Sequence, residues 1–155
     1  MASESENPES GKQEEGNGIA GLQDILGFHI RLAHGAVYRH FSDTFSDLNL
    51  TQKQVSVLWL IDDHPGIAQA DLARLLYMDR ATTMTLVNRL QARHFLRREQ
   101  SAEDGRKQTL FLEPGGKKIL AEAKAAVREH EEWLKSRFTA REVKRLIELL
   151  TRIHD

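Results

Sequence analysis

The chain has 155 residues, of which 40% are hydrophobic and 29% charged, and its formal net charge is −1. This length is typical of one domain with its own core. The absence of cysteine excludes disulfides, thiolate zinc sites and thiol catalysis. No apolar run approaches the ~18 residues of a membrane helix, and the N-terminus lacks the basic and apolar regions of an export signal. We therefore expect a cytoplasmic protein that does not enter the membrane.

The charge is unevenly distributed along the chain. Residues 1–18 carry five glutamates against Lys12, whereas residues 74–107 contain eight arginines and lysines against four acids. A basic segment of this kind is either a solvated face or a contact surface for a polyanion. Residues 1–18 also lack apolar periodicity, which predicts a disordered acidic tail. Residues 19–155 are expected to form the folded domain.

Helical periodicity begins directly after this tail. Apolar residues recur at three- and four-residue steps from Ile19 to Phe45, which predicts a long first helix ending near Asn49. Thr51 and Gln54 form a capping-box pair, so a second helix is expected to start there and to stop before "DDHPG".

The next segment predicts two further helices. The stretch "QADLARLL" indicates a short third helix over residues 69–76, and Asp79 is placed to cap a fourth. The positions of the fourth helix expected to be buried are Thr83, Leu86, Val87 and Leu90.

The period then changes from helix to strand. The segments "FLRRE" and "QTLFLE" are short, apolar or alternating, and separated by a polar loop that contains Gly105, a pattern typical of a β-hairpin. Pro114 can begin the next long helix, whose apolar positions run to Leu134. Thr139 and Glu142 form a second capping box before a last helix that runs nearly to the C-terminus.

These elements predict a mainly α fold. Residues 51–112 form a winged helix-turn-helix, in which the hairpin is the wing, flanked by dimerisation helices over 19–49 and 114–155. The outer helices carry more apolar positions than a core of about 60 residues could cover, so we expect them to pack against a second copy across a two-fold axis.

Three stretches carry a family resemblance: "LTQKQVSVLWLI", "QADLARLLYMDRATTMTLVNRLQARHFLRR" and "EDGRKQTLFLEPGGKKIL". Together they resemble the multiple-antibiotic-resistance regulator (MarR) family of bacterial winged-helix repressors, and the resemblance covers about residues 20–154. It implies a homodimer that binds a pseudo-palindromic operator in double-stranded DNA and leaves it when a small ligand binds.

The resemblance also implies which residues meet DNA. Residues 80–89 match the recognition helix, and Asp104 and Arg106 match the wing's Asp-x-Arg, in which the aspartate positions an arginine that probes the minor groove. Met84 and Thr85 offer apolar contact with thymine methyl groups. The expected contacts are Arg80, Thr82, Met84, Thr85, Asn88, Arg89, Arg97, Arg98, Asp104, Arg106 and Lys107, with Arg97 and Arg98 suited to phosphate. The alternative is that these side chains form an ordinary solvated surface.

An effector site is expected beside the first helix. The segment "FHIRLAHGAVYRHF" resembles the branch of the family that answers to aromatic acids or their coenzyme A thioesters. In the family the pocket lies between the first, second and fifth helices, and aromatic walls with a few cationic groups suit an anionic aromatic ligand. The expected effector-binding residues are Arg31, His34, Tyr38, Arg39, His40, Trp59 and Trp133. The alternative is that these are dimer-core and surface residues.

Other patterns in the sequence bear on enzymatic, metal-sensing and protein-binding functions. The stretch "EPGGKK" lacks the spacing of a phosphate-binding loop, and no Ser, His and Asp arrangement indicates a catalytic centre, so neither an enzyme nor a cofactor is predicted. The seven histidines leave a metal-sensing regulator as an alternative, although His29, His34 and His40 are not at the four-residue spacing of helical metal ligands. A further alternative is a winged-helix module whose basic face binds an acidic protein.

Overall fold

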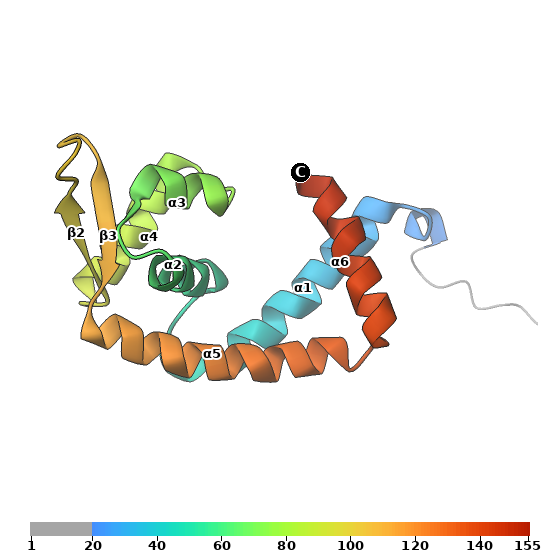
Figure 1. Ribbon diagram of the computed structural model, residues 1–155. Coiled ribbons are helices and arrows are strands. Elements are labelled where there is room, and N and C mark those ends of the chain that lie inside the picture. Colours follow the sequence, from blue (N-terminus) through green and yellow to red (C-terminus); the bar gives the residue numbers. More distant parts are fainter. Residues whose placement is uncertain (1–19) are drawn as a thin grey trace, which may run out of the picture. The chain divides into compact units, whose positions relative to one another are not determined.

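The computed structural model describes residues 20–155 (Figure 1), so the acidic tail predicted for residues 1–18 lies outside the described residues. The chain divides within helix α1 (Leu26–Thr44) into two compact units, of which the first ends at Ala36 and the second spans Val37–Asp155. In the first unit a 3-10 turn, Ala20–Leu22, precedes α1. There His29 donates a hydrogen bond from Nε2 to the Gln23 carbonyl at 2.7 Å.

The second unit contains the remaining elements and is mainly helical, as the sequence predicts (Figure 1). In chain order they are η2 (Ser46–Leu48), α2 (Gln52–Asp63), β1 (Ile67–Ala68), α3 (Gln69–Leu75), α4 (Arg80–Ala92), β2 (Leu96–Gln100), β3 (Gln108–Leu112), α5 (Pro114–Lys135) and α6 (Ala140–His154).

The strands form one small antiparallel sheet in the order β1-β3-β2. Leu96 pairs with Leu112 and Gln100 with Gln108, which confirms the predicted hairpin. The sequence does not predict β1, whose two residues are too few to show a period. It pairs with β3 directly after Gly66, which adopts a φ of 85° that favours glycine.

Side-chain caps define the helix starts where the sequence places them. Thr51 accepts a hydrogen bond from the Gln54 amide at 3.2 Å, and the Gln54 side chain accepts one from the Thr51 amide at 2.9 Å, which confirms the capping box of α2. The capping box formed by Thr139 and Glu142 at α6 is confirmed as well.

Helix α1 is shorter than predicted. It begins at Leu26 rather than near Ile19 and ends at Thr44 rather than near Asn49. Beyond Thr44 the chain turns inward, so that the buried Phe45 ring stacks on Phe41 with centroids 3.9 Å apart. The apolar period therefore continues past the end of the helix, because Phe45 lies in a turn after α1 and its side chain is still buried in the core.

The core of the second unit lies where α2, α4, the hairpin and α5 meet. The predicted buried positions of α4 are confirmed, since Thr83, Leu86, Val87 and Leu90 are all buried. Leu86, Val87 and Leu90 join side chains of the other elements in one cluster that includes Val57, Leu58, Ile61, Leu72, Leu96, Leu110, Leu112 and Leu120.

The glycine pair at the start of α5 has a packing role. A Cβ added to Gly116 would lie 1.9 Å from the Phe95 carbonyl oxygen, whereas one added to Gly115 would meet nothing closer than the His94 carbonyl at 3.5 Å. Helix α5 therefore approaches the start of the hairpin closely enough that only glycine fits at position 116.

We predict opposite outcomes for the two glycines. Gly116→Ala should lower the free energy of unfolding by about 2 kcal/mol, because overpacking forces the backbone to shift. Gly115→Ala is the matched control and should leave it unchanged or raise it by up to about 1 kcal/mol through helix propensity. Urea unfolding followed by circular dichroism measures both, and equal effects would contradict the close approach.

Candidate nucleic-acid interface

The exposed side of α4 is the surface that the core leaves free. Met84 has 50% of its surface exposed, and Arg80, Thr85, Asn88 and Arg89 are exposed as well. Because a helix repeats every 3.6 residues, burial of its opposite stripe fixes which side chains face outward. Within residues 20–155 neither Arg80 nor Arg89 makes an ion pair, so both guanidinium groups are available to an external anion.

Thr82 has an internal role at the start of α4. Asp79 accepts hydrogen bonds from the Thr82 amide and from the Thr82 hydroxyl, both at 2.7 Å. These two bonds, the amide first, lower the pKa of Asp79. The half-buried Thr82 also lines a depression shared with Gln52 and Lys53 of α2. Its hydroxyl therefore caps the helix and differs from the outward-facing predicted contacts.

Arg98 connects the hairpin to both helices of the helix-turn-helix. Its guanidinium donates to the Asn88 side-chain oxygen at 2.6 Å, to the Gln91 side-chain oxygen, and to the Gln69 side-chain oxygen at 3.2 Å. Partial burial lowers the pKa of Arg98. The predicted phosphate-binding arginine thus positions α3, α4 and β2 in the free chain. It also occupies the Asn88 oxygen, so the Asn88 amide group remains as a donor toward base acceptors.

Arg97 lies on the other face of the sheet. Successive side chains of a strand point to opposite faces, so adjacent arginines cannot share one. Arg97 donates to Glu99 at 2.9 Å, lies 3.8 Å from Glu113, and stacks over Phe111 with its guanidinium carbon 4.8 Å from the ring centroid. The structure therefore separates the two arginines that the sequence groups as one basic strand.

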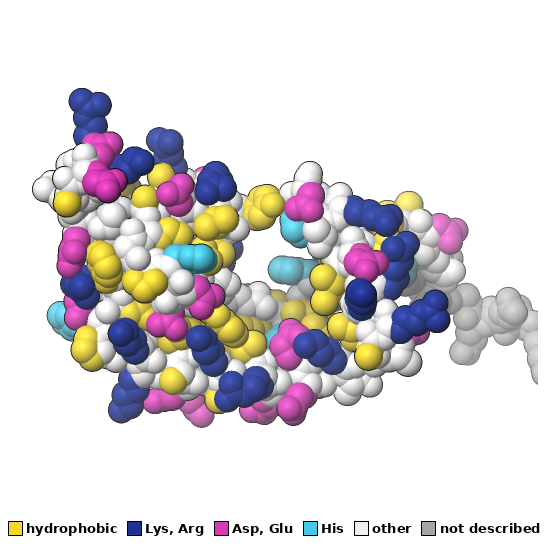
Figure 2. All heavy atoms as spheres, in the orientation of Figure 1, with side chains coloured by type: hydrophobic (Ala, Val, Ile, Leu, Met, Phe, Trp, Pro, Cys, Tyr) yellow, Lys and Arg dark blue, Asp and Glu magenta, His cyan; other side chains and the backbone are white. Residues whose placement is uncertain are grey.

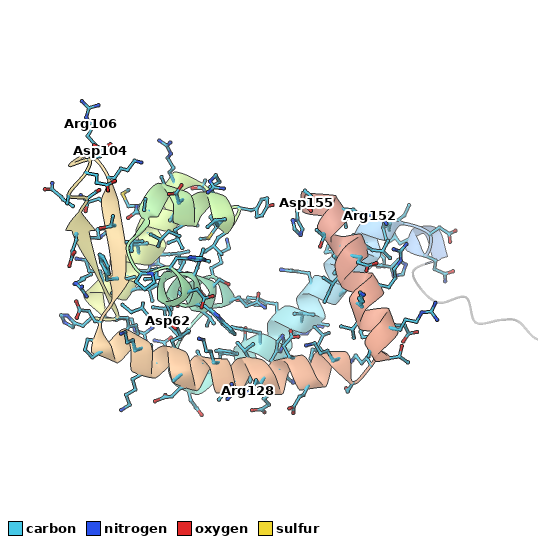
Figure 3. All side chains as sticks on the ribbon, in the orientation of Figure 1. Asp62, Asp104, Arg106, Arg128, Arg152 and Asp155 are labelled. Atoms are coloured by element: carbon cyan, nitrogen blue, oxygen red, sulfur yellow. The ribbon has the colours of Figure 1, made fainter. Side chains whose placement is uncertain are left out.

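The wing tip, residues 101–107, is a closed turn. The Ser101 amide donates to the Lys107 carbonyl and the Lys107 amide to the Asp104 carbonyl, each at 2.9 Å. The Asp104 carboxylate accepts a hydrogen bond from the Arg106 amide at 3.0 Å. Asp104 thus holds the turn through the backbone of Arg106, and Figure 3 shows the Arg106 side chain projecting away from the hairpin.

Exposed basic side chains lie at this tip and on the neighbouring helices. Figure 2 shows Lys and Arg side chains at the hairpin tip and over α3 and α4, interspersed with acids. A helix with outward arginines and a loop that presents Arg106 and Lys107 match the shape and charge of a duplex groove and its backbone.

Comparison with known proteins identifies the family. The sequence profile described as MarR family matches residues 46–107. A Thauera aromatica protein, named as a regulatory protein for the hcr operon, is 31% identical over 130 residues, which is 83% of this chain and 78% of the relative. The chain belongs to the MarR family.

Two further relatives extend this result. The HTH-type transcriptional repressor MT2955 of Mycobacterium tuberculosis is 31% identical over 120 residues, 75% of this chain and 86% of the relative. The solved structure of the transcriptional repressor CouR bound to a 23-mer DNA duplex has a TM-score of 0.82 and 30% identity, covering 86% of this chain and 95% of that one.

The MarR assignment establishes the broad function. This protein is a DNA-binding transcriptional regulator with a winged helix, and it is a regulator rather than an enzyme. Among residues 20–155, no helix is long and apolar enough to cross a membrane. The same residues hold no group of three or more His, Asp or Glu side chains placed to bind a metal ion.

This MarR chain also has a cavity of about 560 Å³ in its second unit, between the end of α1, α2 and α5. Its apolar wall includes Phe41, Trp59 and Val127, and its titratable side chains are Asp63, His130 and Glu131. The full lining is Val37, Phe41, Gln52, Val55, Ser56, Trp59, Leu60, Asp63, Leu76, Val127, His130, Glu131 and Leu134.

The cationic groups predicted for the effector site do not line this cavity. Of the seven expected residues only Trp59 lines it. Arg39 is exposed, and Tyr38 lines a different depression, next to Arg89 and Arg93. Arg31 and His34 belong to the first unit, whereas the cavity is built wholly from the second.

The other two expected residues, His40 and Trp133, do not line the cavity but are close to His130, which does. The His40 ring stacks on Trp133, with centroids 3.9 Å apart and planes 11° from parallel. His40 Nδ1 lies 2.8 Å from His130 Nδ1, which joins α1 to α5. We call His40 and His130 the histidine pair. The sequence places His130 on the apolar face of the long helix but does not assign it to the effector site, and it is the histidine that lines the cavity.

Burial lowers the pKa of His130. His130 is 5% exposed, and burial, then the proximity of His40, lower the pKa of His130, while Glu131 opposes them. The unfolded chain consequently binds more protons than the folded chain once the pH falls below about 6.5, the ordinary histidine value. The free energy of unfolding is therefore highest above that pH, and it falls as the pH drops from there toward the lower pKa of folded His130.

We predict that His130 determines how the free energy of unfolding changes with pH. The free energy of unfolding of the wild type should fall between pH 7.5 and pH 5.5, and His130→Gln should flatten that slope. His64→Gln, which removes an exposed histidine at the end of α2, is the control and should keep the wild-type slope. Urea titrations at three pH values measure this, and an unchanged slope in His130→Gln would refute the assignment.

Proposed function

We propose that this MarR-family regulator is a repressor that binds a pseudo-palindromic operator as a homodimer and is released by a small anionic aromatic effector. The observation that carries the proposal is the wing tip, where Asp104 fixes the Arg106 backbone and the Arg106 side chain projects away from the hairpin (Figure 3). CouR, whose solved structure holds a DNA duplex, and MT2955 are both named repressors. Their resemblance supports the same role here.

The contacts proposed for DNA divide by their chemistry. Arg80, Arg89 and Lys107 supply charge for phosphates, and Arg106 probes the minor groove. Met84, Thr85 and Asn88 face outward at the centre of α4 and are proposed to meet base edges. Thr82, Arg97, Arg98 and Asp104 are bonded within the chain, so we propose that they act on DNA mainly by positioning their neighbours.

The homodimer is supported by an apolar stripe on α6. Its side chains recur at helical spacing and remain exposed in the single chain: Leu146 38%, Ile147 58%, Leu149 41%, Leu150 43% and Ile153 64%. A contiguous apolar face of this kind marks an interaction site, and most oligomers of one chain are two-fold dimers. Two copies would present two α4 helices to successive major grooves on one DNA face, about 34 Å apart.

The effector is proposed to bind the cavity between α1, α2 and α5. An apolar wall with few polar groups is typical of a small-molecule site, and Phe41 and Trp59 suit an aromatic ring. An occupant would touch α2, which packs beneath α4, and α5, which leads to α6. A displacement of a few ångströms between the two α4 helices would then lose one set of half-site contacts.

Mutation of the wing tests this function. Genomic fragments bound by the protein are selected first, and the recovered site is titrated by mobility shift. Arg106→Ala should weaken operator binding about tenfold and reduce the slope of log affinity against log salt by about one, because one cation is lost from the contact.

The control is Arg128→Ala, which removes an exposed arginine of α5 that points away from the wing tip (Figure 3). It should retain wild-type affinity. If no fragment survives competitor DNA, or if both variants bind like the wild type, the proposed function is wrong.

A further inference from the structure

Arg98 is held by three amide side chains. Its Nε donates to the Gln69 oxygen at 3.2 Å, and its two Nη atoms donate to the Asn88 oxygen, at 2.6 Å, and to the Gln91 oxygen. Among residues 20–155 no acidic side chain forms an ion pair with Arg98. Because an arginine can only donate, each of the three amides must turn its oxygen toward the guanidinium. Arg98 therefore fixes which end of each amide points away from it.

The amide nitrogens of the three partners remain unused. Within the part of the chain that the structure describes, no hydrogen bond involves Gln69 Nε2, Asn88 Nδ2 or Gln91 Nε2. Hydrogen bonds that share a group strengthen one another, so donation from the charged Arg98 makes these N–H groups better donors. The surface around Arg98 therefore presents polarised N–H donors to an external molecule.

Asn88 is the amide of this group best placed to reach a base. It is exposed and lies one helical turn after Met84 and Thr85, on the outward side of α4. Gln91 lies in the last turn of α4, and Gln69 begins α3. In a helix-turn-helix the second helix lies in the major groove, whereas the first crosses the DNA backbone. We therefore assign base contact to Asn88 and not to the two glutamines.

The bond to Arg98 changes which base an asparagine recognises. An unrestrained asparagine pairs with adenine through two bonds, in which its oxygen accepts from N6 and its nitrogen donates to N7. The Asn88 oxygen is directed at Arg98, so the N6 group of adenine would lose its acceptor, and an unsatisfied donor is costly. Guanine presents acceptors at both N7 and O6, which suit the two hydrogens of one amide nitrogen.

We propose that Arg98 sets the base preference of α4: by holding the Asn88 oxygen, it makes Asn88 select guanine over adenine in the major groove. This inference rests on the proposed function, because it takes α4 as the helix that enters the groove. Arg98 is a positioning residue that acts through Asn88, and Asn88 is the residue that determines specificity. Arginine keeps its charge throughout the physiological pH range, so the preference should not change with pH.

Selection from randomised DNA tests this proposal. One half of the operator recovered with the full-length protein is randomised, and the pool is selected with the wild type and with Asn88→Ala. Sequencing then gives the relative affinity for each base pair at each position. Asn88→Ala should lose the preference at one position and keep the others. At that position the wild type should prefer a G·C pair over an A·T pair by about tenfold.

Two outcomes of this selection would overturn the proposal. The first is a wild-type preference for an A·T pair, or no preference, at the position that Asn88→Ala affects. The second is a set of preferences that Asn88→Ala leaves unchanged throughout. Either result leaves operator binding intact, so it refutes this inference alone. If the wild type recovers no operator, the proposed function is wrong and this inference is wrong with it.

A matched pair of variants assigns the preference to Arg98. Arg98→Met frees the Asn88 oxygen, so the preference at the same position should shift from G·C toward A·T. Arg97→Met removes the same group from the adjacent position of β2, where it bonds to Glu99, and should leave this preference unchanged whatever its effect on affinity. An unchanged preference in Arg98→Met, or an equal shift in both variants, would contradict the role of Arg98. If Arg98→Met fails to fold, the comparison of the wild type with Asn88→Ala still decides.

Discussion

The buried stripe of α4 determines what the protein can present to DNA. Leu86, Val87 and Leu90 pack into the cluster formed with α2 and the hairpin, and Thr83 is buried on the same side, so the orientation of α4 about its axis is fixed. The outward residues Met84, Thr85 and Asn88 follow from that constraint. Arg98 of β2 donates hydrogen bonds to Gln69, Asn88 and Gln91. These bonds connect α4 to the hairpin that forms the wing.

The sequence predicts well those features that depend on neighbouring residues. The two capping boxes, the Asp79 cap, the buried positions of α4 and the hairpin are all local patterns, and the structure confirms them. The end of α1 was predicted wrongly because Phe45 keeps the apolar period while leaving the helix. Strand β1 has two residues and exists only through its pairing with β3.

The side-chain chemistry of the candidate sites was less accessible to prediction. Adjacent arginines in a sequence look like one basic strand, but alternation sends Arg97 to Glu99 and Phe111 and Arg98 to α3 and α4. The importance of His130 depends on a residue 90 positions earlier, His40, and on the shape of a cavity built from three helices. Neither relation leaves a periodic signal in the chain.

The cavity and the proposed DNA-binding surface of α4 are connected through the same helix, α2. Val55 lies in the buried cluster with Leu86 and Val87 of α4 and also lines the cavity, so α2 contacts both. His130 and Glu131 of α5 form another part of the cavity, and α5 continues toward α6 and its exposed apolar stripe. A ligand in this cavity would therefore contact α2, which packs against α4, and α5, which leads to the proposed dimer contact on α6.

Two copies of α4 and its wing are proposed to bind one duplex together. Hydroxyl-radical footprinting of the selected operator tests this directly. We expect two protected patches of equal strength on one face of the DNA, with their centres about one helical turn, ~10 base pairs, or a multiple of it apart. A single protected patch bound by one chain would contradict binding as a dimer.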